Sequence, residues 1–417
     1  MSFDIIIIGG GIAGLYTAYQ LQKQKPLKKI LILEKEKKLG GRIATYHLGE
    51  LTMEMGAGRF STTNHPYLMY LLDELQLTQK IVDNSDQIMY QSIHNQTPSS
   101  FQKTNDLIQM VMNKAKSINK YLLQNETFES FAKTILTKEE IQYIKDSYGY
   151  YSEIVMMNAY DSIKLLHNLQ EHYSSLRGGL SQLIDRLVTK IGRTVTIKTN
   201  YEVKRIKSVG KSEFIVQTPK RQFQCNYCIF ALPKHALRPF FSPKLLQSIN
   251  EGSLCRIYCK FTVVPNKKVW FHDISKTTTN NQLRMIIPIN KKQGLIMLSY
   301  SDNKYADYWQ SLYNSNTTHK KGIAQVNKQL RLLARETFGF DIPEPMYTKL
   351  CYWKYGVGYW SPGFDSHNIG NEIIEPFPNI FICGENYSEN HQQWIEGALE
   401  TSIQVIESLR IKIPDIL

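Results

Sequence analysis

The sequence has no hydrophobic run long enough to span a membrane. Its longest apolar stretches, "FDIIIIGG" (3–10) and "GLIMLSY" (294–300), have the length of strands, whereas a membrane helix needs about 20 apolar residues. The start "MSFDIIIIGGG" shows no basic leader and no small-residue cleavage site, so we expect no secretory signal. From these absences we expect a cytoplasmic protein.

Cysteine is scarce. The six cysteines are scattered, most of them through apolar, strand-like runs, which predicts reduced, buried thiols rather than disulfides. Cys225 and Cys228 form a C-x-x-C pair, but no second pair completes a zinc site. We therefore expect both to be strand residues and predict no metal.

A long basic block is missing too, although the net charge is +13. The lysines are spread over the whole chain, so nucleic-acid binding is not expected. Hydrophobic residues make up 42% and charged residues 21% of the 417 positions, as in globular proteins. This length suggests two or three domains.

What the sequence does contain is a strand–helix–strand unit at its start, with the second strand in "KKILILEKE". Gly9, Gly11 and Gly14 form G-x-G-x-x-G: the first makes a tight turn, the second lets backbone amides approach a pyrophosphate, and the third lets the helix pack on the strand. Glu34 ends the second strand, where a carboxylate binds a ribose; the alternative is a solvated charge within "EKEKK". In this context the motif predicts dinucleotide binding.

A second glycine turn, "LGGR" (39–42), follows closely and suits a longer, flavin-bearing ligand. At this point the sequence resembles the flavin-containing amine oxidase superfamily, closest to the branch of L-amino-acid oxidases and bacterial tryptophan monooxygenases. The resemblance covers most of the chain. It rests on stretches that occur in the family's order: "GGGIAGL", "LEKEKKLGGR", "EMGAGRF", "YEVKRI", "IFALP" and "FICGENYSENHQQWIEGALE".

The resemblance implies an α/β fold: a Rossmann-like FAD-binding domain of the GR2, glutathione-reductase-like type, with a mixed-sheet substrate domain and a helical insertion. The FAD domain is expected at 1–64, 174–240 and 373–417, the helical domain at 65–173 and the substrate domain at 241–372. Apolar spacings of three and four support the helices, including one over "SIKLLHNLQEHYSSL". "TVTIKTNYEVKRIKSVG" and "FIVQT" predict antiparallel strands.

The resemblance also implies FAD. Monoamine oxidases bind flavin covalently through a cysteine near the stretch matching "YWKYGVGYWSPG", but the nearest cysteine here, Cys351, lies upstream, so we expect non-covalent FAD. Glu34 would hold the adenosine ribose, Arg42 the pyrophosphate and Glu385 the ribityl or pyrophosphate region. The helix N-terminus at 394–398 would face the flavin pyrimidine, where it stabilises negative charge on reduced flavin. The expected cofactor-binding residues are Gly9, Gly11, Ala13, Gly14, Glu34, Lys35, Gly41, Arg42, Gly56, Ala57, Gly58, Arg59, Val203 (through its backbone, at the adenine), Gly384, Glu385, Gln393, Trp394, Ile395 and Ala398.

Arg59, in "EMGAGRFST", is a charged group that is costly to bury without an anion. In L-amino-acid oxidases and tryptophan monooxygenases an arginine at this position clamps the substrate carboxylate, whereas plain amine and polyamine oxidases carry an uncharged residue. A guanidinium fork matches a carboxylate in two parallel hydrogen bonds. The alternatives are a structural pair with an acid such as Glu54 and a contact with the flavin phosphates.

Aromatic residues give further candidates. Tyr355 and Tyr359, in "WKYGVGYW", resemble the family's aromatic wall before the flavin and are candidates to touch the carboxylate or flank the amine. Trp394 resembles the residue beside the flavin. Each could equally be a core residue. His167 is a candidate from the helical insertion, with an ordinary helix histidine as the alternative.

The chain departs from the family at one position. Many members carry a lysine on the first substrate-domain strand, where it holds a water at the hydride-accepting flavin nitrogen. "GSLCRIYCKF" places Arg256 there, unless the alignment slips to Lys260 on the same side of the strand. Since an arginine cannot act as a base at neutral pH, the chain could be an oxidase, a slow oxidase or a dehydrogenase.

The expected function is FAD-dependent oxidative deamination of an L-amino acid. Hydride transfer from the α-carbon to flavin would yield a 2-oxo acid, ammonia and hydrogen peroxide. The alternatives are a primary amine or polyamine oxidase and a non-catalytic FAD-binding module. The expected partners are a small-molecule substrate and dioxygen, with a homodimer left open.

Overall fold

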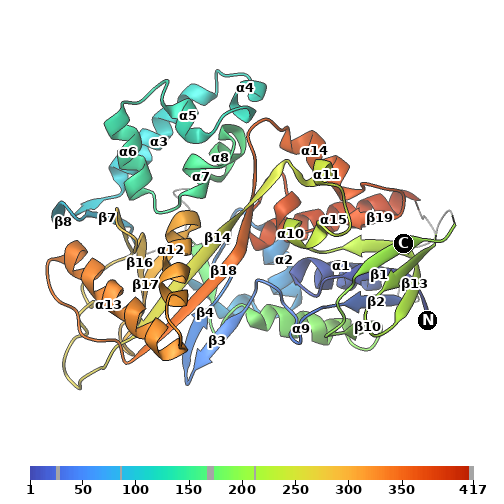
Figure 1. Ribbon diagram of the computed structural model, residues 1–417, viewed down its shortest axis with the longest axis horizontal. Helices are drawn as coiled ribbons and strands as arrows, with labels where there is room; N and C mark the ends of the chain where they lie inside the picture. Colours follow the sequence, from blue (N-terminus) through green and yellow to red (C-terminus); the bar gives the residue numbers. More distant parts are fainter. Residues whose placement is uncertain (25–28, 85–86, 167–172, 211–212, 413–417) are drawn as a thin grey trace.

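The computed structural model describes residues 1–24, 29–84, 87–166, 173–210 and 213–412, which form two sheet-based halves and a helical region (Figure 1). No helix in these ranges is both long and apolar enough to cross a membrane. All six cysteines are buried and free, as predicted.

The first half is built on a seven-stranded sheet. Its centre is parallel and consists of β10 (Val195–Lys198), β2 (Ile30–Leu33), β1 (Ser2–Ile8), β13 (Gln222–Phe230) and β19 (Ile380–Ile382). Its antiparallel edge consists of β12 (Phe214–Gln217) and β11 (Arg205–Ser208). The helices that share one apolar core with this sheet include α1 (Ile12–Gln24), α9 (Ser181–Ile191) and α15 (Ile395–Lys412). Because both faces are covered, the central strands read as continuous Ile and Leu runs.

The second half is also built on a seven-stranded sheet. In spatial order its strands are β18 (Tyr347–Trp360), β14 (Ile249–Lys260), β17 (Leu295–Asp302), β16 (Met285–Asn290), β15 (Thr277–Thr279), β7 (Met89–Ser92) and β8 (Asn95–Ser100). The long strands β14 and β18 pair antiparallel and reach toward the first half (Figure 1). Helices α12 (Asn303–Asn314) and α13 (His319–Phe338) pack on one face. The other face packs against the hairpin of β3 (Thr45–Leu48) and β4 (Leu51–Glu54).

A helical region lies above the second sheet in Figure 1 and has its own apolar core. It contains α3 (Gln102–Ala115), α4 (Lys120–Gln124), α5 (Phe128–Ala132), α6 (Lys138–Ser147), α7 (Ser152–Val155) and α8 (Ala159–Leu166). A small sheet joins β5 (Phe60–Ser61), β9 (Tyr173–Leu176) and β6 (Ile81–Asp83). The remaining short elements are α2 (Pro66–Glu74), η1 (Thr78–Lys80), α10 (Lys234–Leu237), α11 (Pro243–Leu246), α14 (Ser366–Ile374) and η2 (Glu385–Tyr387).

Three local predictions were wrong. Within the helix expected over 162–176, α8 is described as far as Leu166, and residues 173–176 form strand β9 instead. Of the segments expected to be antiparallel, β11 and β12 do pair antiparallel, whereas β10 pairs parallel with β2. The segment expected to be helical also supplies β7 and β8 to the second sheet. Strands β9, β10 and β7 pair with strands that are remote in sequence, and local periodicity carries no signal for such partners.

Candidate functional site

The turn after β1 uses its three glycines in different ways. Gly9 has a φ of +111°, which favours glycine, and a Cβ on Gly14 would lie 2.1 Å from the Gly9 carbonyl oxygen. A Cβ on Gly11 would meet only the Gly41 Cα, at 4.0 Å. The fold itself requires Gly9 and Gly14, whereas Gly11 keeps the backbone at the start of α1 open to a ligand. A pyrophosphate at a helix N-terminus fits this arrangement.

Glu34 lies at the end of β2 and its carboxylate reaches back to this turn. Its Oε2 accepts a hydrogen bond from the Gly10 N–H at 2.7 Å, and its Oε1 accepts one from Glu36 N–H at 2.8 Å. The carboxylate is nearly fully buried beside the glycine turn, so it is not a solvated surface charge. Lys35 is exposed, and Val203 is buried in the core on the other face of the sheet.

Arg42 connects the second glycine turn with the C-terminal part of the site. Its guanidinium forms an ion pair with Glu385 and donates to the Gly356 carbonyl oxygen at 3.1 Å. The second Glu385 oxygen accepts from Gln393 N–H at 2.8 Å. Gln393 Nε2 is buried and has no hydrogen-bond partner among the described residues. An orphaned donor beside Arg42 and the glycine turns fits a polar ligand such as FAD.

Residues 56–58 lie between Arg42 and a second group of charged side chains that includes Arg256. A Cβ on Gly56 would lie 1.9 Å from the Arg42 carbonyl oxygen, and one on Gly58 would lie 2.7 Å from Arg256 Nη1. Ala57 N–H donates to the same Arg42 oxygen at 3.0 Å. The backbone therefore packs tightly between Arg42 and Arg256, and small residues are needed at both glycine positions.

Arg59 lies in an aromatic cage. Its Nη2 donates to the Tyr150 hydroxyl at 2.6 Å, and its guanidinium carbon lies 4.6 Å from the Tyr173 ring centre and 5.6 Å from that of Trp394. Burial lowers the pKa of Arg59, but the neighbouring tyrosines, Tyr150 first, more than offset this and raise it, so the group stays charged. In the described part of the chain no carboxylate oxygen lies within 4.0 Å of it.

Arg256 approaches the same cluster from β14. Its Nη1 donates to the Glu54 carbonyl oxygen at 3.0 Å, its Nη2 donates to the Tyr300 hydroxyl at 3.3 Å, and its buried Nε has no partner among the described residues. Burial raises the pKa of Tyr300, but Arg256 and Arg59 lower it below its ordinary value. Lys260 is four residues, roughly 13 Å, further along the strand, so Arg256 is the cation at this site.

The alternative pairing of Arg59 with Glu54 does not occur. The Glu54 carboxylate accepts hydrogen bonds from Leu180 N–H at 2.6 Å and from the Thr45 hydroxyl at 2.8 Å. Burial raises the pKa of Glu54. Only its backbone carbonyl faces the arginines, where it accepts from Arg256 and, at 2.8 Å, from the Tyr258 hydroxyl.

Trp394 immediately precedes α15 and completes the cage. Its ring stacks on Tyr173, with centroids 5.2 Å apart, and lies 4.9 Å from the His65 ring. Ile395 and Ala398, in the first turn of α15, are buried against α1. The N-terminus of α15 therefore lies beside Arg59.

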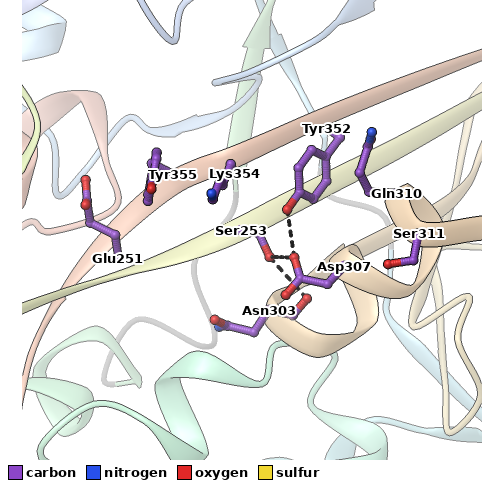
Figure 2. A pocket seen from close by; sticks show the side chains of 9 residues that line it. All are labelled: Glu251, Ser253, Asn303, Asp307, Gln310, Ser311, Tyr352, Lys354 and Tyr355. Atoms are coloured by element: carbon purple, nitrogen blue, oxygen red, sulfur yellow. Dashed lines mark hydrogen bonds between the residues drawn. The ribbon is translucent and has the colours of Figure 1, made fainter. Parts of the chain in front are cut away.

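Tyr355 and Tyr359 do not join this cage. Tyr355 stacks on His235, with centroids 4.0 Å apart, and lines a pocket of about 370 Å³ beside α12 (Figure 2). In that pocket Ser253 and Tyr352 donate hydroxyl hydrogen bonds to Asp307 of α12, at 2.6 and 2.8 Å. Tyr359 is buried in the core of the first half. Because α12 packs on the face of the second sheet opposite Arg256, the sheet separates the pocket from the arginines.

The sequence did not point to Tyr150, Tyr173, Tyr300 or Glu153. Glu153 accepts a hydrogen bond from the Tyr148 hydroxyl, and burial raises its pKa to about 7. These residues belong to a chain with 25 tyrosines, and nothing in their spacing marks them. His167, the remaining candidate, lies outside the described residues.

Two charged groups thus occupy one enclosed cluster walled by aromatic rings. Gly58 packs against Arg256 Nη1, and the charge of Arg256 opposes the tyrosines that raise the pKa of Arg59. Such an arrangement can bind an anion.

Comparisons with known proteins identify the family. The family model described as "Flavin containing amine oxidoreductase" matches residues 12–405. The chain is similar to an uncharacterized protein of Acanthamoeba polyphaga mimivirus, at 20% identity over 96% of this chain and 92% of the relative. It is similar to an L-amino-acid oxidase of Sistrurus catenatus edwardsii, at 21% identity over 96% and 85%.

Solved structures share the fold. A redesigned putrescine oxidase superposes with a TM-score of 0.78 at 15% identity, over 99% of both chains. A putative protoporphyrinogen oxidase from Exiguobacterium superposes with a TM-score of 0.73 at 16% identity, over 98% of this chain and 99% of the other. At these identities the likeness concerns the α/β fold alone.

Proposed function

Because this chain belongs to the flavin-containing amine oxidoreductase family, and is therefore an FAD-dependent oxidoreductase, we propose that it oxidatively deaminates an L-α-amino acid. The products are a 2-oxo acid, ammonia and hydrogen peroxide. Bound FAD supplies the acceptor for the hydride from the substrate's α-carbon. The observation that carries the proposal is Arg59: a buried guanidinium with no carboxylate partner in the described ranges, caged beside the N-terminus of α15.

In this proposal Arg59 grips the substrate carboxylate in a bidentate fork. Tyr150 fixes one guanidinium nitrogen, and the rings of Tyr173 and Trp394 hold the guanidinium in place. A carboxylate held in this way fixes the adjacent α-carbon. Orientation of this kind supplies a large part of the rate enhancement.

The electrostatics favour an acidic group on the substrate over a diamine. Arg59 and Arg256 place two fixed positive charges in one enclosed cluster, and Glu153 is only partly ionised at neutral pH because burial raises its pKa to about 7. A cationic amine without a carboxylate would meet repulsion that little solvent screens. The amine or polyamine oxidase alternative is therefore the weaker one.

The test is anaerobic mixing of the FAD-loaded protein with the twenty amino acids and with common amines, following the flavin absorbance. We expect bleaching by at least one L-amino acid. Arg59→Ala should raise the KM for that amino acid about 100-fold, because a buried charge pair loses one partner at a cost of roughly 2–5 kcal/mol, whereas the response to amines should not fall.

Arg186→Ala is the matched control, since Arg186 is an exposed arginine of α9. It should leave all of these constants unchanged. Bleaching by amines only would establish the amine oxidase instead. No bleaching by any compound would favour the FAD-binding module.

A further inference from the structure

Glu153 of α7 is a buried carboxyl group in the same enclosure as Arg59. The positive charge of Arg59 acts directly on its ionisation. Throughout the described ranges Glu153 has no cation within 4.0 Å, and its carboxylate accepts a hydrogen bond from the Tyr148 hydroxyl. Glu153 and Arg59 are both largely buried, but each residue keeps part of its surface accessible.

Two tyrosines hold these opposite charges apart. The Tyr148 hydroxyl donates to Glu153, the Tyr148 and Tyr150 rings meet edge to face at 6.0 Å, and the Tyr150 hydroxyl accepts from Arg59 at 2.6 Å. A buried carboxylate and a buried guanidinium are each costly without a partner. If their role were purely structural, direct contact would remove both costs. Their separation instead matches a ligand with an acidic group at one end and an ammonium at the other.

We propose, on the premise of the function above, that Glu153 receives an ammonium group of the substrate while Arg59 holds its carboxylate. Two groups of a substrate can supply this ammonium. One is the α-ammonium group that every amino acid carries, and the other is the side-chain ammonium group of a basic amino acid such as L-lysine. The site then recognises a zwitterion by its two ends.

Three charged or titratable groups act directly on Glu153: Tyr148, Asp302 and Arg59. Tyr150 and Tyr173 act in turn on Tyr148. Burial raises the pKa of Glu153 and Asp302 raises it further, whereas the bond from Tyr148 and the charge of Arg59 lower it, giving a value of about 7. Asp302 is itself bound by the backbone and hydroxyl of Ser152. Only the ionised form attracts an ammonium group, so binding weakens as the pH falls through this value.

The experiment measures binding of 2-aminoisobutyrate, an amino acid without an α-hydrogen, to the FAD-loaded protein by calorimetry between about pH 5.5 and 8.5. Isobutyrate, which lacks the ammonium group, is the matched ligand. If Glu153 receives the α-ammonium group, Glu153→Gln should weaken 2-aminoisobutyrate binding about tenfold or more at high pH and abolish its pH dependence. Isobutyrate should bind no more weakly than to the wild type. Glu139→Gln, an exposed glutamate of α6, is the control and should change neither ligand.

Turnover distinguishes the two sources. Loss of L-leucine and L-lysine oxidation together in Glu153→Gln places the α-ammonium at Glu153. Loss confined to L-lysine, with 2-aminoisobutyrate binding intact, places the side-chain ammonium there. Both results support the proposal.

Tyr148→Phe gives an independent check if Glu153→Gln does not fold. Because the Tyr148 hydrogen bond lowers the pKa of Glu153, its removal should move the acid limb of substrate binding to higher pH. Unchanged ligand affinities, pH profiles and L-lysine and L-leucine turnover in both variants would overturn this proposal. If the wild type still bleached with amino acids, the proposed function would survive that result, whereas a wild type that bleached with none would reject the function itself.

Discussion

Arg256 is held in place by contacts that a lysine cannot reproduce. Its two terminal nitrogens bind different partners, the Glu54 carbonyl and the Tyr300 hydroxyl, and its guanidinium carbon lies 4.6 Å from the Tyr300 ring centre. A single ammonium group cannot span both partners with the same fork. A lysine is smaller at its charged end and can release a proton, so it leaves room for an ordered water and can take part in proton transfer.

Arg256→Lys should therefore accelerate reoxidation of the reduced protein by dioxygen, by about tenfold if one positioned proton donor is gained. The rate of flavin reduction by substrate should change less. Mixing the anaerobically reduced variant with oxygenated buffer in a stopped-flow instrument measures the first rate directly. Equal reoxidation rates in wild type and variant would show that this side chain does not limit the reaction with dioxygen.

Single residues were predictable from the sequence where a motif fixes the backbone around them. Glu34 follows a strand at a set distance from a glycine turn, and Arg59 follows a glycine pair. Tyr150 and Tyr300 reach Arg59 and Arg256 only through tertiary contacts, across 91 and 44 positions. No local pattern marks such residues, because each is simply an aromatic side chain on a loop or strand.

The tyrosines of β18 show how strand geometry limits this reasoning. Tyr355 and Tyr359 are four positions apart, so a regular strand would place them on one face. The pairing of β18 with β14 shifts register between Gly252 and Leu254. Tyr355 then faces His235 and Tyr359 enters the core, and a register shift of this kind leaves no trace in the period of the sequence.

At the scale of the element, the turn between β1 and α1 gives a matched pair of substitutions. A Cβ at Gly14 would overlap the Gly9 carbonyl oxygen at 2.1 Å, whereas a Cβ at Gly11 would meet only Gly41, at 4.0 Å. Gly14→Ala should therefore lower the free energy of unfolding of the apoprotein by roughly 1–3 kcal/mol. Gly11→Ala should leave that free energy within about 0.5 kcal/mol of wild type and weaken FAD binding instead.

Chemical denaturation of the apoprotein and fluorescence titration with FAD separate the two effects. Equal losses of stability in both variants would show that Gly11 serves the fold rather than the ligand.

Secondary-structure elements were predictable from the sequence where a local motif defines them: β1 and α1 follow from a buried run and a glycine motif. The parallel pairing of β10 with β2 did not follow, since periodicity reports burial and not the neighbouring strand.

At the scale of the whole molecule, the residues proposed to bind the cofactor come from segments that are far apart in the chain. Gly11, Arg42 and Glu385 belong to three such segments, and the Arg42–Glu385 ion pair joins positions 343 apart. The helical region is not independent of the sheets either, because β7 pairs with β15 of the second sheet. Domain boundaries at 65 and 173 therefore separate strands that pair in the folded chain.

A ligand bound by such separated segments binds the folded chain and not the unfolded one. FAD should therefore stabilise the protein by about 4 kcal/mol at a free concentration 1,000 times its Kd, which raises Tm by several degrees. Scanning calorimetry of the apoprotein at increasing FAD concentration measures this shift. Riboflavin lacks the pyrophosphate and the adenosine ribose that the glycine turn and Glu34 fit, so it should give a much smaller shift. If riboflavin raised Tm as much as FAD does, the turn after β1 would contribute little to cofactor binding. If FAD left Tm unchanged, these segments would not form the cofactor site.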